Sequence, residues 1–319
     1  MTRGRLAVGL VLAALVALPL GGASFYVDLV TKVMILALFA LSLDLLVGHT
    51  GLVSFGHAAF FGIGAYALAL LAPVDGAASL WSTALAAVAL SAAAALVVGL
   101  FVLRTRGVYF IMVTLAFAQM FFFLFHDTDL GRGSDGITLN FRPTAAAFGL
   151  TPFDLADPRH TYYLVLAVLV LALLFLRRLL RSPLGRALQG IRANEHRMLS
   201  LGFPVFRYKL AAFTIAGALA GLAGYLAALQ FGFVNPEILS WHQSGNVLLM
   251  VILGGAGSLL GAVAGAFGLV VLQELFQAAT THWQLPLGAT IVALVLLLPG
   301  GLASLSDRLR RPGAREPGA

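Results

Sequence analysis

Long apolar runs, separated by short polar connections, follow one another along almost the whole chain. Because a helix that crosses a bilayer needs about 20 apolar residues, runs without Asp, Glu, Lys or Arg predict membrane helices. These runs cover residues 6–27, 45–74, 76–103, 107–126, 160–176, 210–236, 238–273 and 275–306.

Two further features set the number of predicted helices. A span at 27–47 carries Asp28, Lys32 and Asp44, and the run 238–273 is interrupted by glycines, so it divides into a short piece and a full span. The pattern predicts an all-α, polytopic integral membrane protein with about ten transmembrane or re-entrant helices. Nine or eleven crossings are the alternatives, because the glycine-rich pieces can be re-entrant rather than spanning.

Composition supports this class. Residues of the set AVILMFWYC make up 60% of the chain, Gly adds 35 more residues, and the mean hydropathy is +0.97. Charged residues amount to 10%, against about 25% in soluble domains, which excludes a soluble globular protein. The chain has no cysteine, which excludes disulfides, thiolate metal sites and cysteine nucleophiles.

The positions of the basic residues predict the orientation. With a cytoplasmic N-terminus, 16 of the 20 Lys and Arg residues fall in cytoplasmic connections, as the positive-inside rule expects. Both termini are then cytoplasmic, 127–159 is an external loop, 177–209 a cytoplasmic loop, and 306–319 a cytoplasmic basic tail. The first span, which follows Arg3 and Arg5, is similar to a signal peptide, but an uncleaved helix preserves this orientation. Dispersed basic residues without a recognition motif argue against nucleic acid.

The cytoplasmic loop predicts a short amphipathic helix. Pro183 opens the helix, and Leu184, Leu188 and Ile191 recur on one face at helical spacing. A basic loop kept only for topology is the alternative. The length and helix punctuation favour a docking element for a cytoplasmic partner.

Two glycine-rich segments, at 47–66 and 254–268, interrupt the apolar pattern. Such paired interruptions point to a solute path near the bilayer midplane, where unwound backbone exposes carbonyl groups. Close helix packing alone is the alternative. The residues that we expect along the path are Gly51, Ser54, Gly56, His57, Gly62, Thr114, Gly254 and Gly257.

A family resemblance covers residues 30–303 in order. The chain resembles the permeases of high-affinity branched-chain amino-acid ABC importers, specifically the type with a Gly-Ser-Asp-Gly external loop. Two departures are a loose match to the general coupling motif and Asn246 at a position where many relatives have an acidic residue. The motifs lie at 51–66, 114–120, 133–136, 192–197, 207–213, 218–224 and 298–302.

The resemblance implies the other subunits of an ABC importer and the role of this chain among them. It implies that 1–319 is a single transmembrane permease domain in the bacterial inner membrane, importing branched-chain amino acids. The implied partners are a second, related permease subunit, cytoplasmic ATPase subunits and a periplasmic amino-acid-binding protein, in addition to the lipid bilayer. Residues 186–202 would form the coupling helix, with Arg186, Arg192, Glu195 and Arg197 coupling to the ATPase, and Ser134 and Asp135 would face the receptor.

The sequence has no motif for ATP hydrolysis, which fits a transporter in which separate subunits use ATP. No phosphate-binding loop is present, so ATP is expected to be used by partner subunits, and we expect this chain to be no enzyme and to hold no cofactor. His49 and His57 have no third ligand nearby in sequence, so no metal site is expected. Asp44 and Glu274 are expected near span ends, where they can reach interfacial water; the alternative is a functional role, which is the default hypothesis for a carboxylate inside a membrane.

Several alternatives stay open from the sequence. The solute can be urea, a short amide or another small carboxylate, and the partner permease can be a second copy of this chain. A secondary carrier or channel that works without an ATPase is a rival, although such carriers usually bury an ionisable relay. An intramembrane enzyme is a third class, for which no catalytic constellation is recognised.

Overall fold

The structure is a computed structural model that describes residues 2–21, 24–73, 76, 78–139, 141–144, 155, 157–298 and 300–304. The predicted basic tail 306–319 lies outside the described residues, as does the middle of the predicted external loop, 145–154.

The described chain is a bundle of helices, as the apolar runs predicted. Six helices in the described part of the chain are long and apolar enough to cross a membrane. They are α2 (Ser24–Thr50), α4 (Leu80–Val102), α5 (Val108–His126), α6 (Pro158–Arg181), α9 (Val205–Phe231) and α11 (Leu259–Ala279). This confirms a polytopic all-α membrane protein.

Four shorter helices of the described chain pack with these six. They are α1 (Thr2–Ala17), α3 (His57–Leu71), α10 (Trp241–Gly254) and α12 (Gln284–Leu297). Helix α1 is followed by the 3-10 turn η1 (Leu18–Gly21), and α10 is preceded by the 3-10 turn η3 (Pro236–Leu239).

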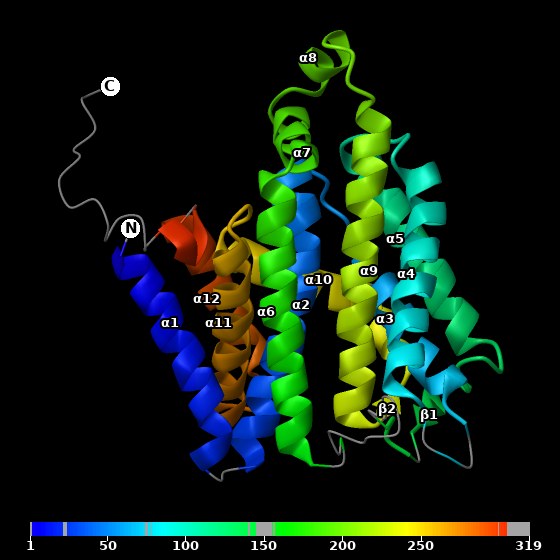
Figure 1. The fold of residues 1–319 in the computed structure, drawn as a ribbon, viewed down its shortest axis with the longest axis vertical. Coiled ribbons are helices and arrows are strands. Elements are labelled where there is room, and N and C mark those ends of the chain that lie inside the picture. The colour runs from blue at the N-terminus through cyan, green and yellow to red at the C-terminus, as the bar shows by residue number, and fades with distance from the viewer. Residues whose placement is uncertain are drawn as a thin grey trace.

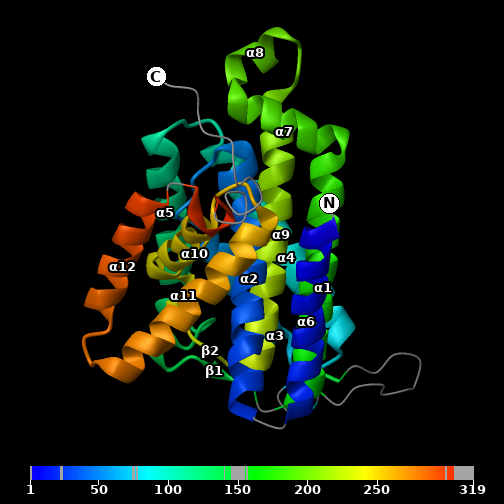
Figure 2. The ribbon, with the colours of Figure 1, turned by 90° about the vertical axis from the view of Figure 1, so that its left-hand side faces the viewer.

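Helix α2 forms the centre of the bundle. In its most apolar stretch of 18 residues, 78% of the residues are buried. It packs against α6, α9, α10 and α11, and the ribbon shows it enclosed by them (Figures 1 and 2). The outer helices α4, α5 and α6 are only 22 to 33% buried over the same length. Large apolar side chains such as Leu85 and Leu171 are exposed there, which fits contact with lipid or with another subunit.

Helices α3 and α9 approach closely through small residues. A Cβ atom on Gly64 would collide with the backbone of Gly221, and one on Gly224 would collide with the carbonyl of Phe61. Because association in lipid depends on van der Waals packing, glycines at this contact allow the backbones to meet.

The two ends of the bundle differ. One end carries α7 (Pro183–Ala193) and α8 (Glu195–Ser200), and the start of α1 and the end of α12 lie toward it (Figures 1 and 2). The other end carries η2 (Gly133–Asp135) and a small antiparallel pair. In this pair, Ile137 of β1 (Ile137–Thr138) is opposite Val234 of β2 (Phe233–Val234).

Candidate functional site

The first glycine-rich segment is a break between two helices. Helix α2 ends at Thr50, residues 51–56 are not helical, and Gly51 has a φ of 74° that favours glycine. The backbone N–H of Phe55 donates to Thr114 Oγ1 at 3.2 Å. The predicted path residues Ser54 and Thr114 are both buried here, so the break lies inside the bundle against α5.

The start of α3 is held by two neighbouring helices. His57 Nε2 lies 2.8 Å from Ser42 Oγ on α2, and its ring stacks on Phe39 with a centroid distance of 5.6 Å. The backbone N–H of Ala58 donates to Ser244 Oγ on α10 at 2.9 Å. These contacts satisfy polar groups at a helix start that has no cap of its own.

The second glycine-rich segment is the turn between α10 and α11. Gly255 and Gly257 have φ values of 99° and 93°. The backbone N–H of Gly257 donates to Asp44 Oδ1 on α2 at 2.7 Å. A Cβ atom on Gly48 would collide with both Asp44 and Gly257, so the two glycine-rich segments meet because side chains are absent at the contact.

Asp44 corrects an expectation. It does not reach interfacial water, because its side chain is fully buried at the meeting point of the two segments. Its second oxygen, Oδ2, lies 3.6 Å from Nε2 of His49. Asp44 is therefore a site residue that the predicted path set omitted, although a carboxylate within an apolar helix had marked it as a candidate.

The loop that we predicted to be cytoplasmic, 177–209, contains two helices in place of the one expected. Asn194 separates α7 from α8, and its side chain accepts a hydrogen bond from the backbone N–H of Arg197 at 2.9 Å, which caps α8. The apolar face predicted for the first helix is confirmed, since Leu188 and Ile191 are buried and Leu184 is half-buried.

Two of the four predicted coupling residues turn toward the membrane helices. Arg192 Nη1 donates to the carbonyl of Gly48 near the end of α2. Glu195 pairs with Lys209 of α9 at 2.8 Å and with Arg106 at 3.6 Å. Arg186 and Arg197 are exposed on the loop, as is Arg192, whereas Glu195 is half-buried.

At the opposite end, the predicted receptor-facing residues Ser134 and Asp135 are exposed in η2. Ser134 Oγ lies 3.3 Å from Nε2 of His126, which in turn pairs with Asp127 at 2.7 Å. Gly136 has a φ of 66° and abuts the ring of Phe233 on β2. The loop is thus joined to the β pair.

The structure brings most of the predicted path residues together, but not all. Ser54, Gly56 and Thr114 enclose a space too small to hold a water molecule. Gly62 lies further along α3, where a Cβ atom would meet Leu239 of η3. Gly51 follows the end of α2 and His57 begins α3, so both flank this space. The last two members of the set, Gly254 and Gly257, lie at the α10–α11 turn beside α2.

Comparison with known proteins identifies the family. The family described as the permease component of branched-chain amino acid transport systems matches residues 25–299. The high-affinity branched-chain amino acid transport system permease protein LivM of Escherichia coli K12 is 38% identical over 299 residues, covering 88% of this chain and 70% of the relative. LivM of Salmonella typhimurium is 37% identical over 301 residues, with the same two shares.

A more distant relative is the autoinducer 2 import system permease protein LsrC of Klebsiella pneumoniae, which is 34% identical over 171 residues, or 51% of this chain and 48% of the relative. No solved structure matches the chain. The family match spans both glycine-rich segments and the two-helix loop, and the chain therefore belongs to the permease components of branched-chain amino acid transport systems.

Proposed function

We propose that this chain is the transmembrane permease subunit of an ATP-driven importer for branched-chain amino acids in the bacterial inner membrane. The names and identities of the LivM relatives support this solute class. In this proposal a periplasmic binding protein delivers the amino acid, and separate ATPase subunits use ATP in the cytoplasm. The chain supplies the moving conduit and holds no cofactor or metal of its own.

One observation carries the proposal of coupling. Arg192 of α7 donates to the carbonyl of Gly48, and Gly48 packs directly against Gly257. Displacement of the loop by an ATPase would therefore act on both glycine-rich breaks at once. Arg186 and Arg197 are exposed and would contact the ATPase, whereas Arg192, through its bond to Gly48, and Glu195, through its pair with Lys209, would transmit the motion inward.

The membrane topology is part of the proposal. The six long helices, with α1, α3, α10 and α12, account for ten crossings if α3 and α10 are broken helices that cross together with their non-helical extensions. Both termini and the loop 177–209 then lie in the cytoplasm, and 127–159 lies outside. The parallel roles of the two glycine-rich segments support an internal repeat within one permease domain.

The proposed path suits a zwitterion with an apolar side chain. Glycine carbonyls near Gly51 and Gly56 and the hydroxyls of Ser54 and Thr114 offer polar contacts without a fixed charge. Because the space between them is closed in this structure, passage requires the helices to separate, as alternating access demands. A related second permease subunit would form the other half of the conduit.

The test is purification of the intact complex. The tagged chain would be extracted gently from its native membrane, and ATP hydrolysis measured with and without receptor and L-leucine. Co-purification of an ATPase and stimulation that depends on leucine are expected. An ATPase without a leucine response would keep the transporter class and reopen urea, short amides or other carboxylates as solutes. Purification without any ATPase would favour a secondary carrier or channel.

A further inference from the structure

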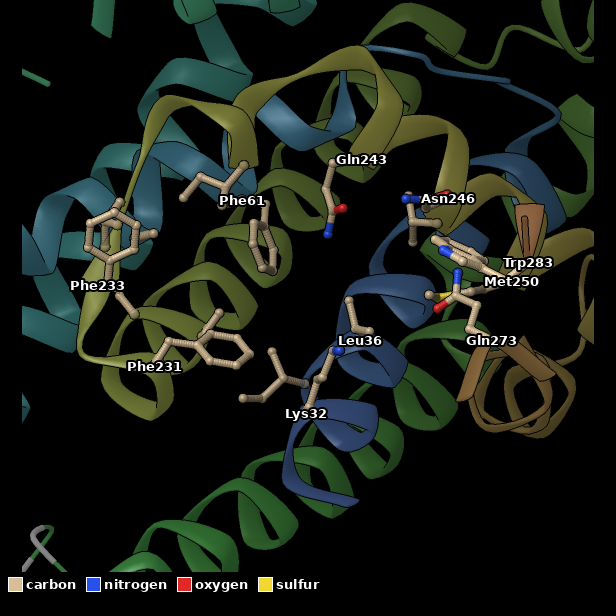
Figure 3. Close-up of a pocket in the computed structure, with 17 residues that line it drawn as sticks. Lys32, Leu36, Phe61, Phe231, Phe233, Gln243, Asn246, Met250, Gln273 and Trp283 are labelled. Atoms are coloured by element: carbon tan, nitrogen blue, oxygen red, sulfur yellow. The ribbon is translucent and has the colours of Figure 1, made fainter. Parts of the chain in front are cut away.

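A cavity of about 310 Å³ lies in the half of the bundle that carries the β pair (Figure 3). Its walls come from α2, α3, α9, α10 and α11, together with β2. The volume is at the lower end of the range for small-molecule sites, which begins at about 300 Å³. A single amino acid is of the right size class for this space, and the cavity lies outside the set of predicted path residues.

Four polar side chains line this otherwise apolar cavity: Lys32, Gln243, Asn246 and Gln273. Figure 3 shows the Lys32 ammonium and the Gln243 amide directed into the open centre, with Asn246 and Gln273 along the same wall. Among the described residues, none of these four side chains forms a hydrogen bond or an ion pair. Polar groups without partners are costly inside a membrane, so their presence here indicates a functional site.

The chemistry of the lining selects a ligand class. It offers one cation and three amides, and no carboxylate lines it among the described residues. The Lys32 ammonium can pair with a carboxylate, and the amide oxygens of Gln243 and Asn246 can accept hydrogen bonds from an ammonium group. Leu36, Phe61 and Met250 provide an apolar surface for the rest of the ligand.

We propose that this cavity is the outer solute site of the permease, which binds the zwitterion of an apolar amino acid as the receptor releases it. This inference rests on the proposed function and names a site for its substrate. Lys32 would hold the carboxylate, and Gln243 and Asn246 would hold the ammonium group.

The position of the cavity fits this role on its outer side. Phe233 and Val234 line the cavity, and they are also the β2 residues that pair with β1. Gly136, directly after the exposed Ser134 and Asp135, packs against Phe233 and the carbonyl of Val234. A receptor that docks on this loop would therefore release its solute beside the cavity.

The cavity is also connected to the break in the helices. Helix α10 contributes Gln243 and Asn246 to the cavity, and Ser244 between them holds the start of α3. The same helix ends at Gly254, just before the turn that Asp44 binds through Gly257. A ligand bound to α10 would therefore contact the helix that packs against the first glycine-rich segment and leads into the second.

The first experiment compares side chains of the cavity with a matched control. The complete complex, with receptor, would be reconstituted in proteoliposomes carrying Lys32→Met, Lys32→Arg, Gln273→Leu or Gln277→Leu. Gln277 is exposed on the same helix as Gln273 and does not line the cavity. L-Leucine uptake and receptor-stimulated ATP hydrolysis would be measured together.

Loss of a contact to a charged group predicts a fall in leucine uptake of about tenfold or more for Lys32→Met. We expect Lys32→Arg to retain most uptake, Gln273→Leu to reduce it and Gln277→Leu to leave it unchanged, while ATP hydrolysis persists in all four. Normal uptake by Lys32→Met and Gln273→Leu would overturn the proposal. Failure of the unaltered complex to transport leucine would count against the proposed function instead.

A second experiment covers variants that fail to assemble. Because the chain has no cysteine, Ala227→Cys places a unique thiol of this subunit in the wall of the cavity, at a position to which no ligand contact is assigned, and Leu171→Cys places one on the exposed face of α6. A positively charged methanethiosulfonate applied from outside should block uptake by Ala227→Cys only. Complete modification with normal uptake, or a thiol that the reagent cannot reach because lipid or a partner helix fills the cavity, would contradict the proposal.

Discussion

The backbone N–H of Gly257 donates a 2.7 Å hydrogen bond to the carboxylate of Asp44, and this contact joins the two glycine-rich breaks across 213 positions of sequence. The Asp44 side chain is fully buried, and Gly257 is half-buried beside the last turns of α2. Because Arg192 donates to the carbonyl of the neighbouring Gly48, helix α7 and both breaks are joined by direct contacts.

Replacement of Asp44 separates a hydrogen-bonding role from a role of charge. Asp44→Leu leaves the Gly257 N–H without its partner in the interior, which should destabilise the subunit by about 1 to 3 kcal/mol and abolish uptake. Asp44→Asn keeps an oxygen acceptor and should retain most uptake. The measurements are leucine uptake and thermal stability of the solubilised complex.

Asp28→Leu is the matched control, because Asp28 is an exposed carboxylate on the same helix. Equal loss of uptake in Asp44→Asn and Asp44→Leu would show that the charge itself is needed, and would favour the proton-coupled carrier over the ATP-driven importer.

Arg192→Ala should uncouple ATP hydrolysis from transport. The substitution removes the only described side-chain donor to the Gly48 carbonyl, so motion of α7 would no longer reach the breaks. Receptor docking should be unchanged, because the loop and the receptor-facing end are at opposite ends of the bundle (Figure 1). Receptor-stimulated ATP hydrolysis and uptake per ATP are the readouts.

Arg186→Ala is its companion variant, since Arg186 is exposed on the same helix. It should weaken ATPase docking without changing the uptake obtained for each ATP. If Arg192→Ala leaves this ratio intact as well, coupling runs through another part of the loop.

The pair between Glu195 and Lys209 should fix the loop to α9. Lys209 is only 11% exposed as a side chain, so Glu195→Gln leaves an enclosed cation without its partner. We expect a loss of stability of about 1 to 3 kcal/mol. The pair with Arg106, which is 63% exposed, should contribute little.

A double-mutant cycle measures this pair directly. The combination of Glu195→Gln with Lys209→Met should be less destabilising than the sum of the single changes, because it removes the unpaired cation. Additive melting-temperature shifts would show that the two side chains do not interact in solution.

Gly62→Leu should abolish uptake while membrane insertion is retained. A Cβ atom at Gly62 already collides with Leu239 of η3, so a larger side chain would push α3 away from the segment that leads into α10. Gly288→Leu on α12 has open space around it and should transport normally. Gly51→Leu should fail as well, because a leucine rarely adopts a φ of 74°. Full uptake by the Gly62 variant would show that the close contact of α3 with η3 is not needed for transport.

Much of the architecture was predictable because it depends on local composition. The apolar run 107–126 includes the whole of α5, and the run 160–176 lies inside α6. Both runs predicted helices because each has nearly the length that a bilayer requires. Likewise, the glycines at 51 and 257 marked positions where the backbone leaves the helix.

The contacts between these segments were not predictable from local pattern. Nothing near Asp44 in sequence indicates that it binds Gly257, and nothing in the loop indicates that Arg192 turns inward to Gly48. The cavity presents the same difficulty, because Lys32 and Gln273 are isolated polar residues in apolar helices that only the tertiary arrangement brings together. Asp44 and Lys32 carried only the general signal of an ionisable group within a predicted span.

We propose that ATP drives inward movement of a branched-chain amino acid through this chain. The most direct measurement is uptake of L-leucine by proteoliposomes that contain the complete complex, with ATP enclosed beside the ATPase subunits and receptor outside. We predict accumulation that requires both ATP and receptor and that Arg192→Ala abolishes while ATP hydrolysis continues. Accumulation without ATP that follows a proton gradient would contradict the account.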